Sequence, residues 1–397
     1  MKRLFFFIIV NISLYFVYSE QLVVLPSGNP IIIKDNKTWY HLPESDLVLE
    51  TSNAWILLHS DGTWIMLDGK DDRYPADGKI GLINKDINNT LMPQQIGFAF
   101  SSLSDAFDYN IYISIVKNAM GKVEVVDSQN SQPTQNDQVD AFLSKKMKAI
   151  AINPVDRTAA AAIIEKAKAK KTPVVFFNRE PLPEDMAAWD KVYYVGAKAE
   201  QSGTMQGQIV VDYWKANPAA DKNKDGKIQY IMLKGEPGHQ YAELRTKFSI
   251  QAVTDAGIEV EEIAEDTAMW DRPKAFEKMK AFYAAYGDKI EVVFCNNDDM
   301  ALGSIEALES DGYFAGGKQV VVVGVDATAP ALQAVEEGTL LGTVLNDSKN
   351  QGKAIFDLAY ALAKGEDVTK AGWEIADGKY VWVPYQMVTK ENYTQFK

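Results

Sequence analysis

From residue 95 onward, short apolar runs alternate with amphipathic helical patterns, and this alternation constrains the fold more than any other feature. Strands that are apolar throughout are typical of parallel sheets covered by helices on both faces. The predicted strands are 95–100, 122–128, 149–153, 172–178, 191–195, 228–234, 258–263, 291–296, 319–325 and 340–345. The predicted helices are 105–120, 136–146, 158–170, 201–216, 243–256, 273–286, 300–310 and 350–363. These strands are more than a single open sheet usually holds. The sequence therefore predicts an α/β protein with two doubly wound lobes.

The residues before this region have a different pattern. Residues 31–40 and 56–65 each contain an apolar run, a polar turn and a Thr-Trp pair. These features predict two β-hairpins over 20–74 that form a small sheet around Trp39, Trp55 and Trp64. An interaction module and a structural decoration both fit this segment. Residues 75–94 are polar and rich in turn formers, which predicts a linker.

Residues 1–19 are typical of an export signal. Lys2 and Arg3 precede an apolar stretch, and Ser19 ends an approximate cleavage site. An uncleaved anchor is the alternative. Because no cysteine lies near this site, a lipid anchor is not expected, and we expect a soluble, exported protein. The only cysteine, Cys295, lies in an apolar run and is predicted to be a buried thiol. The net charge of −13 argues against a nucleic-acid partner.

Residues 221–229 have the spacing of a calcium-binding loop. Asp221, Asn223, Asp225 and Gln229 supply oxygens at loop positions 1, 3, 5 and 9, and Gly226 allows the sharp turn at position 6. Position 7 is Lys227, whose backbone carbonyl would coordinate. The carboxylate usually found at position 12 is missing, because Met232 stands there. Either the segment is a solvated turn, or a carboxylate from elsewhere in the fold completes the site.

Polar side chains follow most of the predicted strands, at the edge where ligands bind in doubly wound sheets. Helix capping explains the Asn and Asp residues one by one, but it does not call for the His, Arg and Trp that accompany them. Carboxylates and amides suit the hydroxyls of a sugar, and aromatic faces cover its C–H surfaces. The sequence therefore predicts a site for a polyhydroxylated ring. The candidate residues are Asp105, Phe107, Asn178, Arg179, His239, Tyr241, Arg245, Trp270, Asn297, Asp326 and Asn346.

Several runs make the family resemblance specific. These are residues 234–239 (KGEPGH), 266–271 (DTAMWD) and 290–293 (IEVV) leading into Asn296, Asn297 and Asp298. From about residue 95 to 396, the chain resembles the periplasmic galactose/glucose-binding proteins of bacterial ABC sugar uptake systems. The resemblance implies two lobes, 95–197 with 343–379 and 198–342 with 380–397, joined near Gly196, Leu341 and Gly372.

The resemblance also implies roles for the candidate residues. Phe107 and Trp270 would stack on the sugar, and Asp105, Asn178, His239, Arg245, Asn297, Asp326 and Asn346 would hydrogen-bond to it. A distant glutamate, Glu291, would complete a structural Ca²⁺ site with Asp221, Asn223, Asp225, Lys227 and Gln229. Two positions depart from the family. Tyr241 replaces a second Asp that bonds near the anomeric hydroxyl, which puts the choice between glucose and galactose in doubt, and Arg179 stands where the family tends to have Lys.

The resemblance implies a monomeric receptor that binds glucose or galactose without being an enzyme. Its expected partners are the membrane subunits of an ABC permease, with a chemoreceptor as a second candidate. One alternative is a glycoside-acting enzyme that uses Asp105 and Asp326 as its carboxylate pair. Others are a surface protein that acts through the Trp hairpins and a sugar-responsive transcription factor. The acidic charge, the export signal and the lack of a helix-turn-helix pattern argue against the transcription factor.

Overall fold

The computed structural model describes residues 95–119, 123–315 and 318–397 in full, and before them the backbone of several strands. The early strands form two antiparallel sheets. The first has the order β1-β2-β3-β4 and the second β5-β6-β7. Their bounds are β1 Phe6–Ile9, β2 Ile12–Val17, β3 Glu20–Val24, β4 Pro30–Ile33, β5 Leu47–Glu50, β6 Trp55–Leu58 and β7 Trp64–Leu67. They belong to a different compact unit from most of the chain after residue 95.

The β6–β7 pair is the second of the two predicted hairpins. The prediction of one small sheet needs correction, because β4 pairs with β3 in a separate sheet. Strands β1 and β2 fall within the predicted export signal, since its aromatic and β-branched residues also suit strands. Whether this segment is removed stays a prediction. Trp39 and the predicted linker 75–94 lie outside the described residues.

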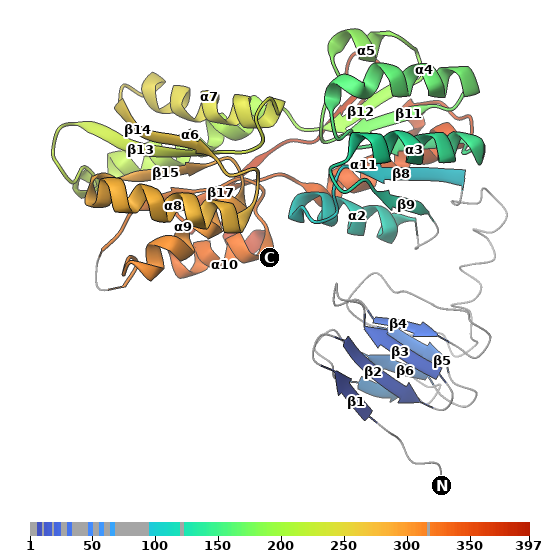
Figure 1. Ribbon diagram of the computed structural model, residues 1–397, viewed down its shortest axis with the longest axis horizontal. Coiled ribbons are helices and arrows are strands. Elements are labelled where there is room, and N and C mark those ends of the chain that lie inside the picture. The colour runs from blue at the N-terminus through green and yellow to red at the C-terminus, as the bar shows by residue number, and fades with distance from the viewer. Residues whose placement is uncertain are drawn as a thin grey trace. The chain divides into compact units, whose positions relative to one another are not determined.

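The first lobe is built on a six-stranded parallel sheet with the order β18-β12-β11-β10-β8-β9. Every residue of β8 is buried, which explains why its sequence is apolar throughout. Helices flank the sheet (Figure 1), and α11 packs on four of its strands. The elements are β8 Ile96–Phe100, α2 Ala106–Asn118, β9 Glu124–Asp127, α3 Gln132–Ser144, β10 Ala149–Ile152, α4 Ala160–Lys170, β11 Val174–Phe177, α5 Pro183–Ala187, β12 Val192–Gly196, α11 Ser348–Ala363 and β18 Tyr380–Trp382.

The second lobe has a six-stranded sheet with the order β14-β13-β15-β16-β17-β19, in which only β19 runs antiparallel. Its elements are α6 Ala199–Ala216, β13 Lys227–Lys234, α7 Gln240–Asp255, β14 Glu259–Thr267, α8 Arg272–Tyr286, β15 Val292–Cys295, α9 Asp298–Ser310, β16 Val321–Val323, α10 Ala329–Glu337, β17 Gly342–Leu345 and β19 Gln386–Thr389. Short 3₁₀ turns lie at Arg157–Ala159, Pro218–Ala220, Gly287–Lys289, Val368–Ala371 and Tyr393–Gln395.

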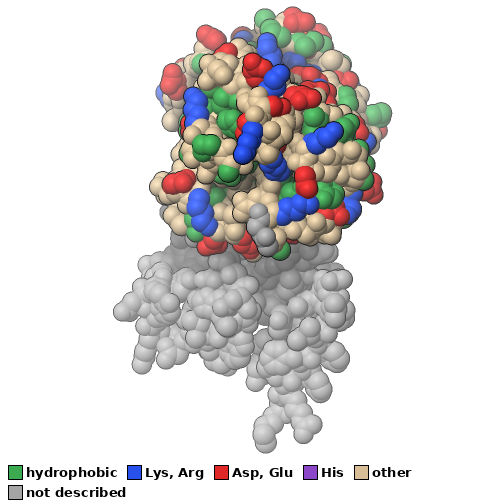
Figure 2. All heavy atoms as spheres, turned by 90° about the vertical axis from the view of Figure 1, so that its left-hand side faces the viewer, with side chains coloured by type: hydrophobic (Ala, Val, Ile, Leu, Met, Phe, Trp, Pro, Cys, Tyr) green, Lys and Arg blue, Asp and Glu red, His purple; other side chains and the backbone are tan. Residues whose placement is uncertain are grey.

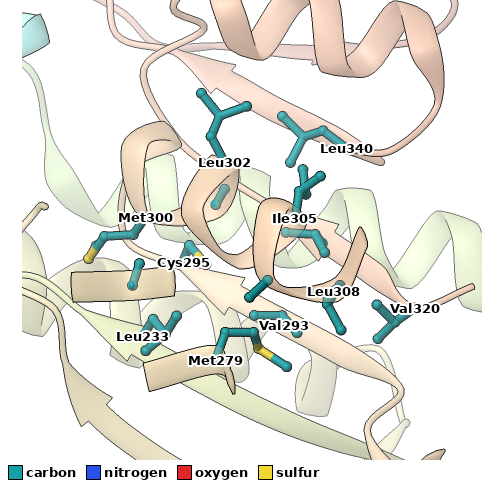
Figure 3. Close-up of a cluster of buried hydrophobic side chains, with 14 of the residues drawn as sticks. Leu233, Met279, Val293, Cys295, Met300, Leu302, Ile305, Leu308, Val320 and Leu340 are labelled. Carbon is teal, nitrogen blue, oxygen red and sulfur yellow. The ribbon is translucent and has the colours of Figure 1, made fainter. Parts of the chain in front are cut away.

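Each lobe has its own hydrophobic core. In the second lobe, one core lies beneath α8, α9 and α10, and Leu233, Val293 and Ile305 are among its buried side chains (Figure 3). Cys295 is buried in this core, as predicted. A further core packs on the other face of the same sheet against α6 and α7. On the face shown in Figure 2, acidic and basic side chains are interspersed, which suits a surface exposed to water.

The two-lobed α/β fold is confirmed, and every strand predicted after residue 95 is present. Strands β18 and β19 and helices α5 and α10 were not predicted, because each is short. None of the helices among the described residues combines the length and apolarity needed to cross a bilayer.

The predicted crossovers near Leu341 and Gly372 need correction. The apolar run 340–345 is one strand of the second sheet, so it cannot be divided between lobes, and the chain crosses only after Leu345. Residues 380–382 pair with β12 in the first sheet, so the last crossover follows Trp382. The remaining crossover follows Gly196, at the end of β12.

Candidate functional site

A cavity of about 560 Å³ lies at the carboxyl ends of the strands and is lined by residues of both lobes. All the candidate ring-binding residues line it. The first lobe contributes Asp105, Phe107, Asn178 and Arg179, and the second contributes His239, Tyr241, Arg245, Trp270, Asn297, Asp326 and Asn346. Parallel pairing explains the convergence, because it brings the ends of successive strands to one edge of each sheet.

The two aromatic rings come from different lobes. Phe107 lies in the first turn of α2 and is buried, and Trp270 precedes α8. Trp270 has a positive φ of 63° and lies against Gly235. A Cβ at residue 235 would lie 2.1 Å from the indole, so this close approach requires glycine. His239 contacts the same indole edge-on, with a centroid distance of 5.1 Å. The Trp270 ring is therefore held by its contacts with the backbone at Gly235 and with the imidazole of His239.

His239 presents a defined tautomer to the cavity. Its Nδ1 accepts a hydrogen bond of 3.1 Å from the backbone N–H of Tyr241, so the neutral ring carries its proton on Nε2. Burial, and then the positive charges of Arg179 and Arg245, hold the pKa of His239 well below its usual value. The imidazole is thus neutral at physiological pH and can donate from Nε2.

Arg245 lines the cavity and is held by hydrogen bonds to neighbouring groups. It donates to the carbonyl of Asn296 at 2.7 Å and to the hydroxyls of Ser202 and Tyr385, both at 3.2 Å. It also pairs with Asp326 at 3.6 Å, and both side chains are buried. Burial nevertheless raises the pKa of Asp326 well above its usual value. Most of the Arg245 donors are therefore engaged by protein groups, and the guanidinium chiefly fixes Asp326 in place.

The amides of Asn297 and Asn346 are oriented by their neighbours. Asn297 caps α9 through Oδ1 and donates to the carbonyl of Trp270 at 3.3 Å. Asn346 donates to Asp326 at 3.2 Å and accepts from Gln351 at 2.6 Å. Each amide is thus held in one orientation before any ligand arrives, which lowers the entropy cost of binding.

Tyr241 was expected to meet the ligand with its hydroxyl. In the structure, this hydroxyl points away from the cavity. It donates to the carbonyl of Ala197 at 3.0 Å and lies 2.9 Å from the hydroxyl of Tyr194, a residue of the first lobe. The longer Tyr side chain carries its oxygen past the cavity wall to the crossover after Gly196. The aromatic ring of Tyr241 is therefore what lines the cavity.

Three further lining residues were not among the candidates: Asp108, Glu236 and Asp299. Arg179 pairs with Glu236 of the other lobe at 2.9 Å. Asp108 is buried in α2 and accepts hydrogen bonds from three neutral side chains. Asp299 follows Asn297 and also lines the cavity. Asp108 looks like an ordinary first-turn acid in the sequence, so only the fold distinguishes it.

The loop 221–229 brings its oxygen-bearing side chains together. Asp221 accepts from the backbone N–H groups of Asp225 and Gly226, and Gln229 donates to Asp225 at 2.8 Å. Both carboxylate oxygens of Glu291 reach this loop, through the N–H groups of Lys222 and Gln229 at 2.7 and 3.0 Å. Within the described parts of the chain, no group of three His, Cys, Asp or Glu side chains stands together as a metal site. The donor set of carboxylate, amide and carbonyl oxygens nevertheless has the chemistry of a hard cation site.

We expect Arg245→Met to lower the free energy of unfolding by about 3–5 kcal/mol at pH 8, because Asp326 would remain buried without its cation. Losing the guanidinium raises the folded-state pKa of Asp326 further. A carboxyl with a raised folded-state pKa destabilises the fold as pH rises, so the penalty should shrink toward pH 5. Urea denaturation at both pH values measures this.

The control is the double variant Arg245→Met/Asp326→Asn. The double variant removes the titrating carboxyl. Its loss of unfolding free energy relative to the wild type should therefore change less between pH 5 and pH 8 than the loss in Arg245→Met. An Arg245→Met penalty of equal size at pH 5 and pH 8 would contradict the assignment of this pair.

Comparison with known proteins gave consistent matches. The family model for the periplasmic binding protein domain matches residues 80–367. The D-galactose/methyl-galactoside binding periplasmic protein of Haemophilus influenzae is 48% identical over 277 residues, which cover 69% of this chain and 82% of that protein. A putative rhizopine-binding protein of Rhizobium meliloti is 32% identical over 276 residues, with the same shares of coverage.

A solved structure agrees with these matches. The ABC transporter solute-binding protein of Bacillus halodurans, which holds myo-inositol, is 30% identical to this chain with a TM-score of 0.64. The match covers 76% of this chain and 96% of that one.

Proposed function

This chain belongs to the periplasmic binding protein family, and we propose that it captures a hexose of the glucose or galactose type between its lobes. The observation that carries the proposal is the convergence of the candidate side chains on one cavity. The similarity to a protein named for binding D-galactose and methyl-galactoside supports this choice of ligand class.

The geometry suits recognition of a ring with several hydroxyls. Phe107 and Trp270 offer aromatic faces from the two lobes, and His239 offers a donor. Asp105 and Asp326 offer acceptors, while Asn297 and Asn346 are already oriented. A site of this kind rejects analogues that lack a hydroxyl, because its buried polar groups would go unpaired. Affinity in the micromolar range corresponds to about −8 kcal/mol.

We propose that binding is coupled to closure of the lobes about the crossovers after Gly196, Leu345 and Trp382. The closed form would be recognised by the membrane subunits of an ABC permease, with a chemoreceptor as a second candidate partner. On this proposal the protein is a monomer that is exported to the periplasm. The family match and the similarity to an ABC transporter solute-binding protein support this assignment.

The site favours holding a ligand over cleaving one, so we propose that the protein is not an enzyme. Asp326 accepts from Asn346 and pairs with Arg245. Asp105 accepts from the backbone N–H of Asp108 at 2.9 Å. The matched proteins are named for solute binding, which agrees with this role.

We further propose that the loop 221–229 and Glu291 hold a structural Ca²⁺. Asp221, Asp225 and Glu291 would supply carboxylate oxygens, Asn223 and Gln229 amide oxygens, and Lys227 its carbonyl. Glu291 is buried, and burial raises its pKa, so a bound cation would compensate for a charge that the fold disfavours. The ion would tie the start of β13 to the residue that precedes β15.

Calorimetric titration with glucose, galactose, ribose, arabinose and xylose tests the proposed function. We expect micromolar or tighter binding of a hexose and weaker binding of the pentoses, which lack one hydroxymethyl group. Absence of heat with every sugar, from a protein shown to be folded by its thermal transition, would overturn the proposal.

Trp270→Ala should weaken hexose binding by roughly 1–3 kcal/mol, because one aromatic face is lost. Trp373→Ala is the matched control, since that indole donates to Asp357 beside α11 and does not line the cavity. Titration of both variants measures the difference. An affinity for Trp270→Ala equal to that of the control would count against the assigned stacking role.

Chelation should lower the melting temperature of the wild type by about 3–4 °C for a chain of this length, because a free cation concentration near 100 times the Kd contributes about 2.7 kcal/mol of stability. Glu291→Gln should melt lower and lose the response to chelator. Glu261→Gln is the control, because Glu261 accepts from Gln229 without belonging to the proposed ligand set. Identical melting of the wild type with and without chelator would refute the calcium proposal.

A further inference from the structure

Asp108, a residue that lines the cavity, connects three neutral side chains. It is 1% exposed. Its Oδ2 accepts from the Ser101 hydroxyl at 2.9 Å and from the Asn153 amide at 2.7 Å. Its Oδ1 accepts from the Asn178 amide at 3.0 Å. Both of its carboxylate oxygens are therefore engaged by side chains of the protein.

The backbone of Asn178 is also held. It has a φ of 56°, in the left-handed region. Its N–H donates to the carbonyl of Val195 at 3.3 Å, and its own carbonyl accepts from the Tyr194 hydroxyl at 2.7 Å. With the backbone fixed at both ends, the remaining freedom of Asn178 is the rotation of its amide group. That rotation decides whether the oxygen or the nitrogen meets a ligand.

We propose that Asp108 is a specificity-determining positioning residue, which holds the Asn178 amide with its nitrogen inward and its oxygen toward the ligand. An ionised carboxylate only accepts hydrogen bonds, so it selects the Nδ2 side of the amide. Asp105, three residues before Asp108, is a further acceptor in the same wall. Asn178 and Asp105 together therefore select ligands that donate hydrogen bonds at the positions facing these two residues. The inference rests on the proposed function and deepens it.

The charges around Asp108 make this arrangement depend on pH. Burial, and then the neighbouring Asp105, raises the pKa of Asp108 to about 7. Arg179 acts in the opposite direction, as do the donors Ser101 and Asn153. A protonated Asp108 can donate, so it no longer discriminates between the two ends of the Asn178 amide. Orientation of Asn178 should therefore become stricter as pH rises through 7.

The test compares ligands that differ by one donor. The wild type and Asp108→Asn are titrated with the preferred hexose and with each of its monofluoro-deoxy analogues, in which C–F cannot donate. The wild type should lose at least tenfold in affinity for the analogue whose fluorine faces Asn178 and Asp105. In Asp108→Asn that loss should fall to threefold or less, because the new amide can pair with either end of Asn178.

The control is Ser101→Ala, which removes one hydrogen bond from the same carboxylate and leaves Asn178 paired. It should change the affinity for all analogues by a similar factor. A uniform loss across ligands in Asp108→Asn would show a merely structural role and overturn the inference. If the wild type binds no hexose, the proposed function fails first, so the two failures are distinguishable.

The pH profile gives an independent measurement. Wild-type affinity for the hexose should rise between pH 6 and pH 8, and Asp108→Asn should flatten this rise. Where Asp108→Asn does not fold, Asp108→Glu provides the second variant. It keeps the charge but lengthens the side chain by one methylene, and it should keep a pH dependence while altering the ranking of analogues. An unchanged profile in Asp108→Asn, or an unaltered ranking in a folded Asp108→Glu, would contradict the proposal.

Discussion

Parallel strand pairing is the constraint on which the rest of this molecule depends. In both lobes it directs the carboxyl ends of the parallel strands to one edge, where several strands are followed by a polar residue. Asn178, Asn297 and Asn346 each follow a strand and each line the cavity. The apolar strands therefore do two things: they build the cores, and they deliver polar groups to a shared site.

Those polar groups are supported by a second layer of contacts. Arg245 fixes Asp326, Gln351 orients Asn346, and Asp108 holds Asn178. Several of these supporting groups are buried and charged, which costs desolvation energy unless each finds a partner. Asp298 is another example: it is buried beneath the second lobe's site, and burial raises its pKa to about 7 although it accepts from Thr343 and Thr328. Such groups limit how far the site can rearrange.

Much of the fold and many of the site residues were predictable from the sequence, and the predictions that were wrong have physical causes. Fully buried apolar strands such as 149–152 carry an unambiguous pattern, because both of their faces are covered. Strand β18 is short and only its middle residue, Val381, is buried, so it is not a fully buried strand of this kind, and the last crossover was misplaced. The side chains that follow strands could be named in advance, but their directions could not. Tyr241 lines the cavity yet sends its hydroxyl to Tyr194, and Asp108 acts from within a helix.

The burial of Cys295 has a practical consequence. It is the chain's only cysteine, and burial raises the pKa of its thiol to about 12, so it stays protonated and shielded from reagents. Met269, by contrast, is 41% exposed at the rim of the cavity. A Met269→Cys variant would thus carry one reactive sulfur beside the site. A polarity-sensitive fluorophore attached there would report occupancy of the cleft as a change in emission, with no background labelling to subtract.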